Sequence, residues 1–431
     1  MSIDNQIRKG LGWTTISTVV IAVVAIVKIS VLARFLDKSD FGLMAIVTFV
    51  ISFMELFNDF GVSIGILHKQ DITKREYHSL YWVNLGISVM LFGVLAVLSP
   101  FIAGFYDMPR LTELLWLIGF NLVISGIGRQ FKTIEQKELQ FNYIALVDMI
   151  GALLSLVVAI YLAMRGYGVL SLVYSLMIQF GFVNLCYFVR GIKKYGLSFH
   201  CKIKETIPFL KIGMYQVGGQ VANYFNRDLD VLLIGKFFSP DVLGGYSLAK
   251  QLVFRPFQLL NPIVLRVASP VLARFQNDIA ELRRRYLSML NMIATLNIVV
   301  YGLLIIFAPL AVHILYGQEF DSIVILVRIL SIYMIFRAIG NPVGSLVIAT
   351  GRTDLDFYWN LLLLLIMPIF IYVGSLFGII GVTLSLVLAM IVLYIPSWKL
   401  FISKLLDVSL MDYIRSCFVL DFKKIIHGIK S

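Results

Sequence analysis

Long apolar segments dominate this chain, and they restrict its fold more than any other feature. A helix needs about 20 apolar residues to cross about 30 Å of hydrocarbon. Hydrophobic residues make up 59% of the sequence and charged residues 14%, which excludes an ordinary soluble domain. The sequence therefore predicts an all-α integral membrane protein with about twelve transmembrane helices. These are expected at residues 13–36, 41–61, 80–105, 112–130, 142–164, 168–189, 208–238, 242–267, 286–315, 322–350, 354–376 and 378–400.

Short motifs recur in the same order in the two halves. ARFLDKSDFG at 33–42 returns as GKFFSPDVLG at 235–244, and ELQF at 138–141 returns as DLDF at 354–357. Two weaker pairs, at 105–106 with 315–316 and at 167–176 with 377–386, keep similar offsets of 210 residues. Repeats of this kind are typical of transporters that alternate between two open states. We predict two six-helix lobes related by internal duplication.

Four regions follow from this pattern. They are an N-lobe at 1–190, a cytoplasmic linker at 191–207, a C-lobe at 208–400 and a cytoplasmic amphipathic tail at 401–431. In the tail, Leu406, Leu410, Tyr413 and Cys417 lie at helical spacing. An interfacial amphipathic helix is therefore favoured there over another span.

Basic residues concentrate in the loops on one side of the predicted spans. The clusters are Lys69, Lys74 and Arg75, then Lys193, Lys194, Lys202 and Lys204, and then Arg283, Arg284 and Arg285. Since Lys and Arg accumulate in cytoplasmic loops, both termini are predicted to be cytoplasmic. The same rule explains the net charge of +12 without a nucleic acid partner. The three cysteines are scattered, so we expect no disulfide, zinc site or other cofactor.

One polar stripe marks the segment 208–238. Gln216, Gln220, Asn223, Arg227 and Asp230 follow at steps of four, three, four and three, which places them on one helix face. A polar group facing hydrocarbon costs several kcal/mol, so this face must contact another helix or water. Interhelical hydrogen bonding is one interpretation, and a water-filled central cavity is the favoured one.

Charges inside the predicted spans differ between the two lobes. The first lobe contains the carboxylates of Glu55 and Asp59, whereas the second is rich in arginine and lysine. Arg227, Arg255 and Arg337 have the deepest predicted positions among the second-lobe cations, and Lys250 lies nearer the end of its span. Arginine offers a planar fork that suits phosphate oxygens, so the expected substrate is an anion.

Two pairs of ionisable residues suggest coupling and gating. Glu55 and Asp59 lie four residues apart on one helix face, where mutual repulsion helps one carboxylate to hold a proton. They are either an ion-coupling site or simple counter-ions for arginines of the other lobe. Lys28 and Asp230 correspond through the 202-residue offset. They form either a gate across the outer mouth or a chance pair of inward-facing groups.

Three stretches carry a family resemblance: ARFLDKSDFG, NYFNRDLDVLLIGKFFSPDVLGGYSLAKQL and RVASPVLARFQND. They resemble the polysaccharide transporter family, which includes O-antigen and exopolysaccharide flippases, within the multidrug/oligosaccharidyl-lipid/polysaccharide exporter superfamily. The resemblance implies a multi-pass protein of the bacterial inner membrane that flips an undecaprenyl-diphosphate-linked oligosaccharide from cytoplasm to periplasm. It also implies contact with membrane lipids, and a polysaccharide polymerase or ligase is a candidate partner.

The resemblance also implies roles for individual residues. The diphosphate would contact Arg227, Lys250, Arg255 and Arg337, and the sugars would contact Gln216, Gln220, Asn223 and Asn226. A drug or metabolite exporter of the same superfamily is the nearest alternative, although an acidic cavity would suit it better. A membrane enzyme acting on polyprenyl-linked sugars is less favoured, because the outer loops are short and carry no nucleophile-base pair. A scaffold would gain nothing from a buried polar stripe. We therefore expect a transporter rather than an enzyme.

Overall fold

The computed structural model describes residues 3–69 and 71–420, and the regular structure of that part is helical. Side chains at 3–8, 212–216, 219 and 260–270 lie outside this description. The helices of the first half are α1 (Ile3–Leu32), α2 (Lys38–Asn58), α3 (Val62–His68), α4 (Lys74–Tyr106), α5 (Arg110–Lys137), α6 (Phe141–Met164) and α7 (Val169–Tyr195). Those of the second half are α8 (Ile203–Phe237), α9 (Pro240–Arg274), α10 (Ile279–Tyr316), η1 (Gln318–Ile323), α11 (Val324–Gly340), α12 (Val343–Thr350), α13 (Thr353–Ser375), α14 (Gly378–Ser397), the π-helical η2 (Trp398–Ser403), α15 (Lys404–Leu406) and α16 (Leu410–Phe418).

The prediction of an all-helical membrane protein is confirmed. In the described residues, ten helical segments are long and apolar enough to cross a membrane. The 35-residue helices α8 and α9 are not among the ten, although each is long enough to span. Both helices contain side chains outside the described residues, and the ten segments are drawn from the described residues alone. The count of twelve spans therefore stays a prediction.

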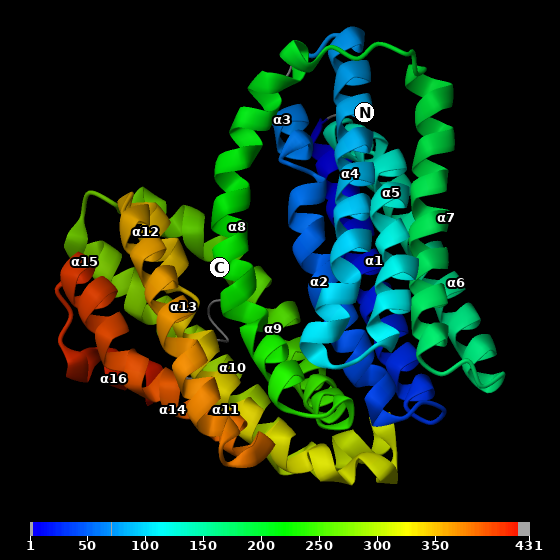
Figure 1. The fold of residues 1–431 in the computed structure, drawn as a ribbon. Coiled ribbons are helices and arrows are strands. Elements are labelled where there is room, and N and C mark those ends of the chain that lie inside the picture. The colour runs from blue at the N-terminus through cyan, green and yellow to red at the C-terminus, as the bar shows by residue number, and fades with distance from the viewer. Residues whose placement is uncertain (1–2, 70, 421–431) are drawn as a thin grey trace. The chain divides into compact units, whose positions relative to one another are not determined.

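Contacts divide the chain into two units, Met1–Gly244 and Gly245–Ser431. In the first unit, α1 packs on α6, and α5 packs on both α4 and α7. α8 packs against α2, α3 and α4, so this helix belongs to the first unit, although its sequence matches the start of the second lobe (Figure 1). The packing boundary thus lies after α8, whereas the lobe boundary that we place at 191–207 follows the repeat.

Two glycines allow α5 to approach its neighbours closely. A Cβ on Gly126 would lie 2.3 Å from Ser88 Oγ of α4, and a Cβ on Gly128 would lie 2.5 Å from the Asn184 carbonyl oxygen of α7. Small residues at such points let membrane helices pack with short backbone separations. The close packing brings polar side chains of α2, α4 and α5 within hydrogen-bonding distance.

The repeated motifs meet in a reciprocal contact between α2 and the start of α9. A Cβ on Gly42 would lie 1.9 Å from the Pro240 carbonyl oxygen, and a Cβ on Gly244 would lie 1.7 Å from the Lys38 carbonyl oxygen. Gly42 corresponds to Gly244, and Lys38 to Pro240, through the same offset of 202 residues. Gly42 of α2 thus packs against the start of α9, and Gly244 of α9 packs in the same way against the start of α2. Contacts about a two-fold axis have this reciprocal form.

The tail folds onto the second unit. α16 forms where an amphipathic helix is expected, but Leu406, Tyr413 and Cys417 are buried in the protein. The Tyr413 ring stacks on Tyr394 of α14, with centroids 5.1 Å apart. The Asn291 side chain of α10 donates to the Ser416 carbonyl at 3.0 Å. Part of this helix thus packs against α10 and α14, whereas Met411, Ile414 and Phe418 are exposed. The interfacial tail at 401–431 stays a prediction, and its residues 421–431 lie outside the described part of the chain.

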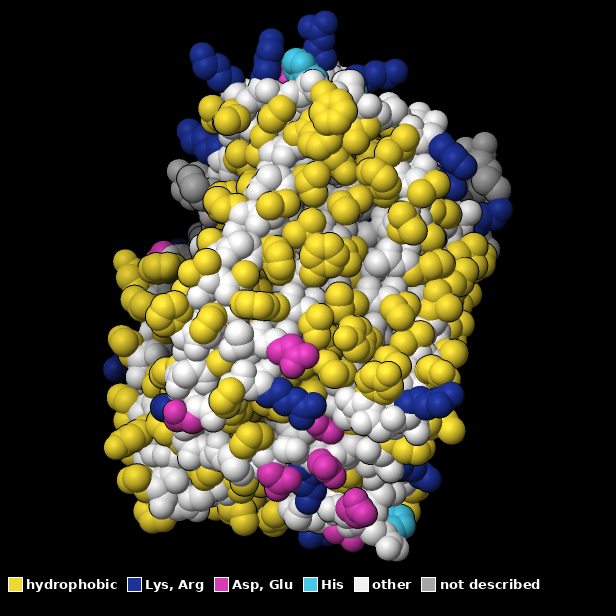
Figure 2. All heavy atoms as spheres, turned by 45° about the vertical axis from the view of Figure 1, so that its right-hand side comes forward, with side chains coloured by type: hydrophobic (Ala, Val, Ile, Leu, Met, Phe, Trp, Pro, Cys, Tyr) yellow, Lys and Arg dark blue, Asp and Glu magenta, His cyan; other side chains and the backbone are white. Residues whose placement is uncertain are grey.

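Surface composition agrees with a membrane location. Figure 2 shows hydrophobic side chains covering the middle of the visible face, with lysine and arginine side chains gathered at one end. Acidic and basic side chains are mixed toward the other end. Such an apolar band between two polar ends matches the layers of a bilayer.

Candidate functional site

An ion pair lies at the centre of a polar network in the first unit. The Arg129 side chain of α5 pairs with the Glu55 carboxylate of α2. Arg129 Nη2 also donates to Ser125 Oγ at 2.8 Å, one turn earlier on α5. The two charged side chains are 20% and 23% exposed, so both are largely removed from solvent. Pairing and hydrogen bonding offset the cost of placing these charges inside an apolar bundle.

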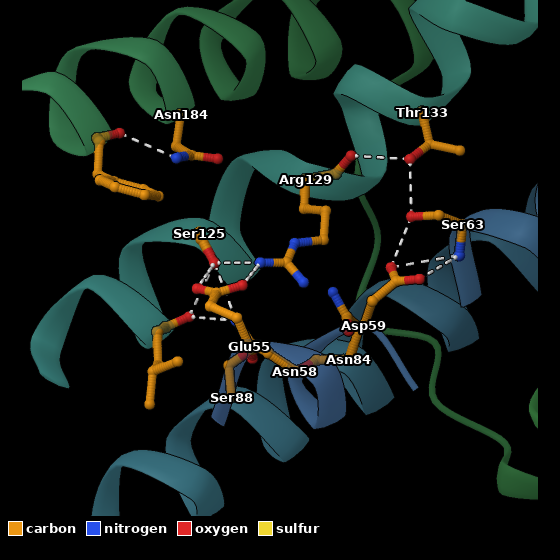
Figure 3. A network of polar contacts seen from close by, with 12 residues as sticks. Glu55, Asn58, Asp59, Ser63, Asn84, Ser88, Ser125, Arg129, Thr133 and Asn184 are labelled. Carbon is orange, nitrogen blue, oxygen red and sulfur yellow. Dashed lines mark hydrogen bonds and ion pairs between the residues drawn. The ribbon is translucent and has the colours of Figure 1, made fainter. Parts of the chain in front are cut away.

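A fully buried amide extends the network to α4. Asn58 Nδ2 donates to Ser125 Oγ at 2.9 Å and to the Leu122 carbonyl at 3.2 Å, both on α5. Ser88 Oγ of α4 donates to Asn58 Oδ1 at 2.7 Å. Asn58 therefore uses both ends of its amide to join three helices, as Figure 3 shows.

Asp59 lies one residue later, where α2 ends, and has a different environment. It accepts hydrogen bonds from the Ser63 hydroxyl at 2.5 Å and from the Ser63 backbone amide at 3.3 Å. Thr133 Oγ1 of α5 donates in turn to Ser63 Oγ at 3.0 Å. Hydroxyl and amide donors, not an ion pair, hold this carboxylate among the described residues (Figure 3).

The structure thus distinguishes the two carboxylates that the sequence treats alike. Glu55 has a counter-ion, and that counter-ion belongs to its own unit rather than to the other lobe. Arg129 is not among the predicted site residues, because it lies at the end of a predicted span, where an arginine is expected to reach toward water. Its spacing from Ser125, one turn earlier on the same face, was the available signal.

Lys28 of α1 is held in the first unit. Its Nζ donates to Ser155 Oγ of α6 at 2.8 Å. The Asp230 side chain on α8 is buried, and its Oδ1 accepts from the Val231 amide at 2.9 Å. The ammonium therefore bonds to a hydroxyl in this structure, and the gate between Lys28 and Asp230 stays a prediction.

The polar stripe of α8 lies beside a buried aromatic contact. Tyr224 is buried and donates its hydroxyl to the Phe49 carbonyl of α2. Gln220 and Asn223 are exposed, and Asn226 is partly buried. Arg227 is 52% exposed, and its Nε pairs with Asp228 at 2.7 Å. Gln216 lies among the side chains outside the described residues.

In the second unit, two predicted substrate-binding cations meet at one aromatic ring. Lys250 Nζ lies 5.5 Å from the centroid of Phe254 on α9, and the Arg337 guanidinium carbon of α11 lies 5.3 Å from the same centroid. Arg337 Nη1 also donates to the Tyr333 hydroxyl at 2.6 Å. Arg255, the residue after Phe254, is partly buried. An aromatic face attracts a cation without cancelling its charge.

The polar network around Glu55 and the cations at Phe254 differ in the chemical groups that they contain. Among residues 3–69 and 71–420, no group of three or more His, Cys, Asp or Glu side chains is placed to hold a metal ion. The network around Glu55 in the first unit offers carboxylates, an ion pair and several hydroxyl groups, and the second unit offers two cations on one ring.

Comparison with known sequences identifies the family. The family model described as "Polysaccharide biosynthesis protein" matches residues 31–325. The chain is 31% identical to the lipopolysaccharide biosynthesis protein WzxC of Escherichia coli K12, over 96% of this chain and 85% of that protein. It is 30% identical to the teichuronic acid biosynthesis protein TuaB of Bacillus subtilis 168, over 83% and 74% of the two chains.

Solved structures show the same fold. The lipid II flippase MurJ in an inward closed conformation aligns with a TM-score of 0.77 at 15% identity, covering 97% of this chain and 92% of that one. A multidrug resistance MATE family transporter of the MOP superfamily, in an inward-facing conformation, aligns with a TM-score of 0.68 at 13% identity, covering 90% and 96%. The resemblance drawn from the sequence motifs is confirmed, and the chain belongs to the polysaccharide biosynthesis protein family of membrane transporters.

Proposed function

We propose that this protein is a flippase that moves an undecaprenyl-diphosphate-linked oligosaccharide from the cytoplasmic to the periplasmic side of the bacterial inner membrane. The observation that carries the proposal is the pair of cations, Lys250 and Arg337, placed on the Phe254 ring inside an apolar helical bundle. Charges in such a setting are costly and therefore usually functional. A diphosphate is the anionic group that this family's substrates would present.

The residues divide by chemistry in this proposal. Arginine and lysine side chains form charge-assisted hydrogen bonds with phosphate oxygens, whereas amides suit sugar hydroxyls. The diphosphate group is assigned to Arg227, Lys250, Arg255 and Arg337, and the sugars to Gln216, Gln220, Asn223 and Asn226. The polyprenyl chain would stay in the lipid, because transferring it into water would cost about 0.8 kcal/mol per CH₂ group.

Transport would proceed by alternating access between two duplicated halves. The reciprocal contact of Gly42 and Gly244 supports this, because corresponding residues of the two motifs meet symmetrically. Two related halves in contact about a pseudo-two-fold axis are typical of transporters that expose one site to each side in turn.

A proton or another ion would drive the cycle from the first unit. Asp59 is the stronger candidate carrier, because hydroxyl and amide groups surround it, whereas Glu55 is held by Arg129. The orientation with both termini in the cytoplasm rests on the distribution of basic loops. A polysaccharide polymerase or ligase would receive the flipped unit.

Deletion of the gene in its host tests the proposal directly. We expect loss of a surface glycan and accumulation of complete lipid-linked repeat units on the cytoplasmic side, measured by mass spectrometry of both pools. Reintroduction of the wild-type gene should restore the glycan, whereas the double variant Lys250→Gln/Arg337→Gln should not. Accumulation of flipped but unpolymerised units would instead indicate a membrane enzyme. A normal glycan would favour the exporter of small molecules.

A further inference from the structure

Two cavities occupy corresponding places in the two units. The first, about 210 Å³, lies between the start of α4 and the carboxyl ends of α5 and α7. The second, about 290 Å³, lies between the α9–α10 connection, the end of α12 with the turn after it, and α15. The three walls of the first cavity correspond to the three walls of the second in the predicted six-helix repeat. Both cavities lie at the helix ends that are joined by the basic loops.

Individual lining residues correspond through the repeat offsets. The start of α4 corresponds to the α9–α10 connection at an offset of 202 residues. The end of α5 corresponds to the end of α12 at an offset of 216, and the end of α7 corresponds to α15 at an offset of 210. The lining pairs are Lys74 with Gln276, Tyr77 with Ile279, Ile134 with Thr350, Lys194 with Lys404, and Tyr195 with Leu405. Both cavities therefore have a lysine, Lys194 or Lys404, at the corresponding wall.

Each cavity has two lysine or arginine side chains at its walls. The first has Lys74 and Lys194, and the second has Arg352 and Lys404. Lys194 pairs with Glu138, and Arg352 pairs with Asp354 at 2.9 Å. Both still have further N–H donors. Lys74 and Lys404 are exposed and have no carboxylate within ion-pair distance among the described residues. Each cavity thus offers cationic donors to an anion.

The first cavity also contains an unused acceptor. Gln130 lines it and is 3% exposed. Its Nε2 donates to the Tyr77 carbonyl at 2.7 Å, whereas its Oε1 accepts no hydrogen bond in the described part of the chain. A buried acceptor without a partner costs about 1–3 kcal/mol, so a ligand that donates a hydrogen bond would be favoured. The apolar walls, which include Phe131 and Leu197, suit a partly hydrophobic molecule.

We propose that these two cavities bind the headgroups of membrane phospholipids, one in each unit, by their phosphate. In the first cavity the headgroup would also donate a hydrogen bond to Gln130 Oε1, as the glycerol of phosphatidylglycerol and the ammonium of phosphatidylethanolamine are able to do. Clusters of basic side chains at the membrane surface typically bind lipid phosphate. The cavity linings include none of the residues assigned to the transported substrate, so this proposal stands or fails independently of the flippase function.

Native mass spectrometry of the purified full-length protein tests the proposal by counting bound phosphatidylglycerol. Wild type should retain two lipids, Lys74→Glu and Lys404→Glu should each retain one, and the double variant should retain none. The matched control is Lys193→Glu/Lys399→Glu, which changes two exposed lysines that do not line the cavities. Equal retention by the double variant and this control would overturn the proposal.

Lipid chemistry supplies a second test that needs no variant. Phosphatidylcholine has the phosphate but no N–H or O–H donor, so wild type should bind one fewer phosphatidylcholine than phosphatidylglycerol. Equal binding of the two lipids would contradict the role of Gln130. Glycerol 3-phosphate, added at the same concentration as the lipid, should displace little of it. Complete displacement would assign the cavities to a free phosphate compound and overturn the lipid assignment.

Discussion

The two units stabilise buried charge in different ways. In the first, the Glu55 carboxylate meets a guanidinium, and serine and asparagine side chains bond to the pair. In the second, Lys250 and Arg337 lie on the face of one phenylalanine. An ion pair joins two helices through opposite charges, whereas an aromatic face attracts cations through the quadrupole of its ring. The comparison teaches that the described contacts of the first unit connect opposite charges on different helices, whereas those of the second gather two like charges at one ring.

The largest expected effect tests the second unit. Lys250→Gln/Arg337→Gln should lower transport of lipid-linked oligosaccharide by more than about 100-fold, because each charge-assisted hydrogen bond contributes about 1.5–3 kcal/mol. The measurement is flipping in proteoliposomes, with membrane insertion checked by gel filtration of the extracted protein. Arg328→Gln is the matched control, since Arg328 is an exposed arginine of the same helix. Transport unchanged by the double variant would remove the cation pair from the mechanism.

A smaller effect is expected where the two repeated motifs meet. Gly42→Ala or Gly244→Ala should each destabilise the protein by about 1–3 kcal/mol, because the new Cβ overlaps a backbone carbonyl oxygen. Thermal unfolding of detergent-solubilised protein measures the change. The reciprocal geometry further predicts that the two substitutions have similar costs and are not additive, since either one separates the same two helices.

The control for this contact is Gly86→Ala on α4, where a Cβ would meet nothing within 4 Å. Alanine there should be neutral or stabilising, because it lowers the entropy of the unfolded chain. A cost at Gly42 no greater than at Gly86 would show that the symmetric contact does not hold α2 against α9.

Variants of Glu55 and Asp59 should differ in their effects on stability and on the gradient dependence of transport. Glu55→Gln leaves Arg129 without its counter-ion, so it should reduce stability by about 1–3 kcal/mol, and Glu55→Gln/Arg129→Gln should recover part of that loss. Asp59→Asn should have little effect on stability but should weaken the dependence of transport on a proton gradient. If Asp59→Asn transports with an unchanged gradient dependence, the coupling site lies elsewhere.

The smallest effect concerns α8. In a background without the native cysteines, the variants Gln220→Cys and Asn223→Cys should react several-fold faster with a water-soluble thiol reagent than Val221→Cys and Ala222→Cys. The expected reason is that the polar stripe faces water, whereas the intervening side chains are partly buried. Labelling rates equal at all four positions would argue against a hydrated cavity along this helix.

Pattern alone predicted much of the fold. Apolar length placed the long helices. The span predicted at 322–350 is divided in the structure into α11 and α12 at Asn341 and Pro342, where proline removes a backbone donor. The site was predicted less completely. Lys250 and Arg337 were chosen for their charge inside an apolar span, and the structure brings them to one ring. Arg129 was missed, because its partner Glu55 is 74 residues away and no local pattern links them.

The sequence by itself determined the membrane class, the helical periods, the repeat and the family, since each depends on local composition or on similarity along the chain. Only the tertiary structure decided which charges meet, that α8 packs with the first unit, and that Tyr413 and Cys417 of α16 are buried. The physical reason is that hydrophobic burial specifies which face of a helix is covered, but not which helix covers it. Ion pairs and glycine contacts between distant segments depend on that choice.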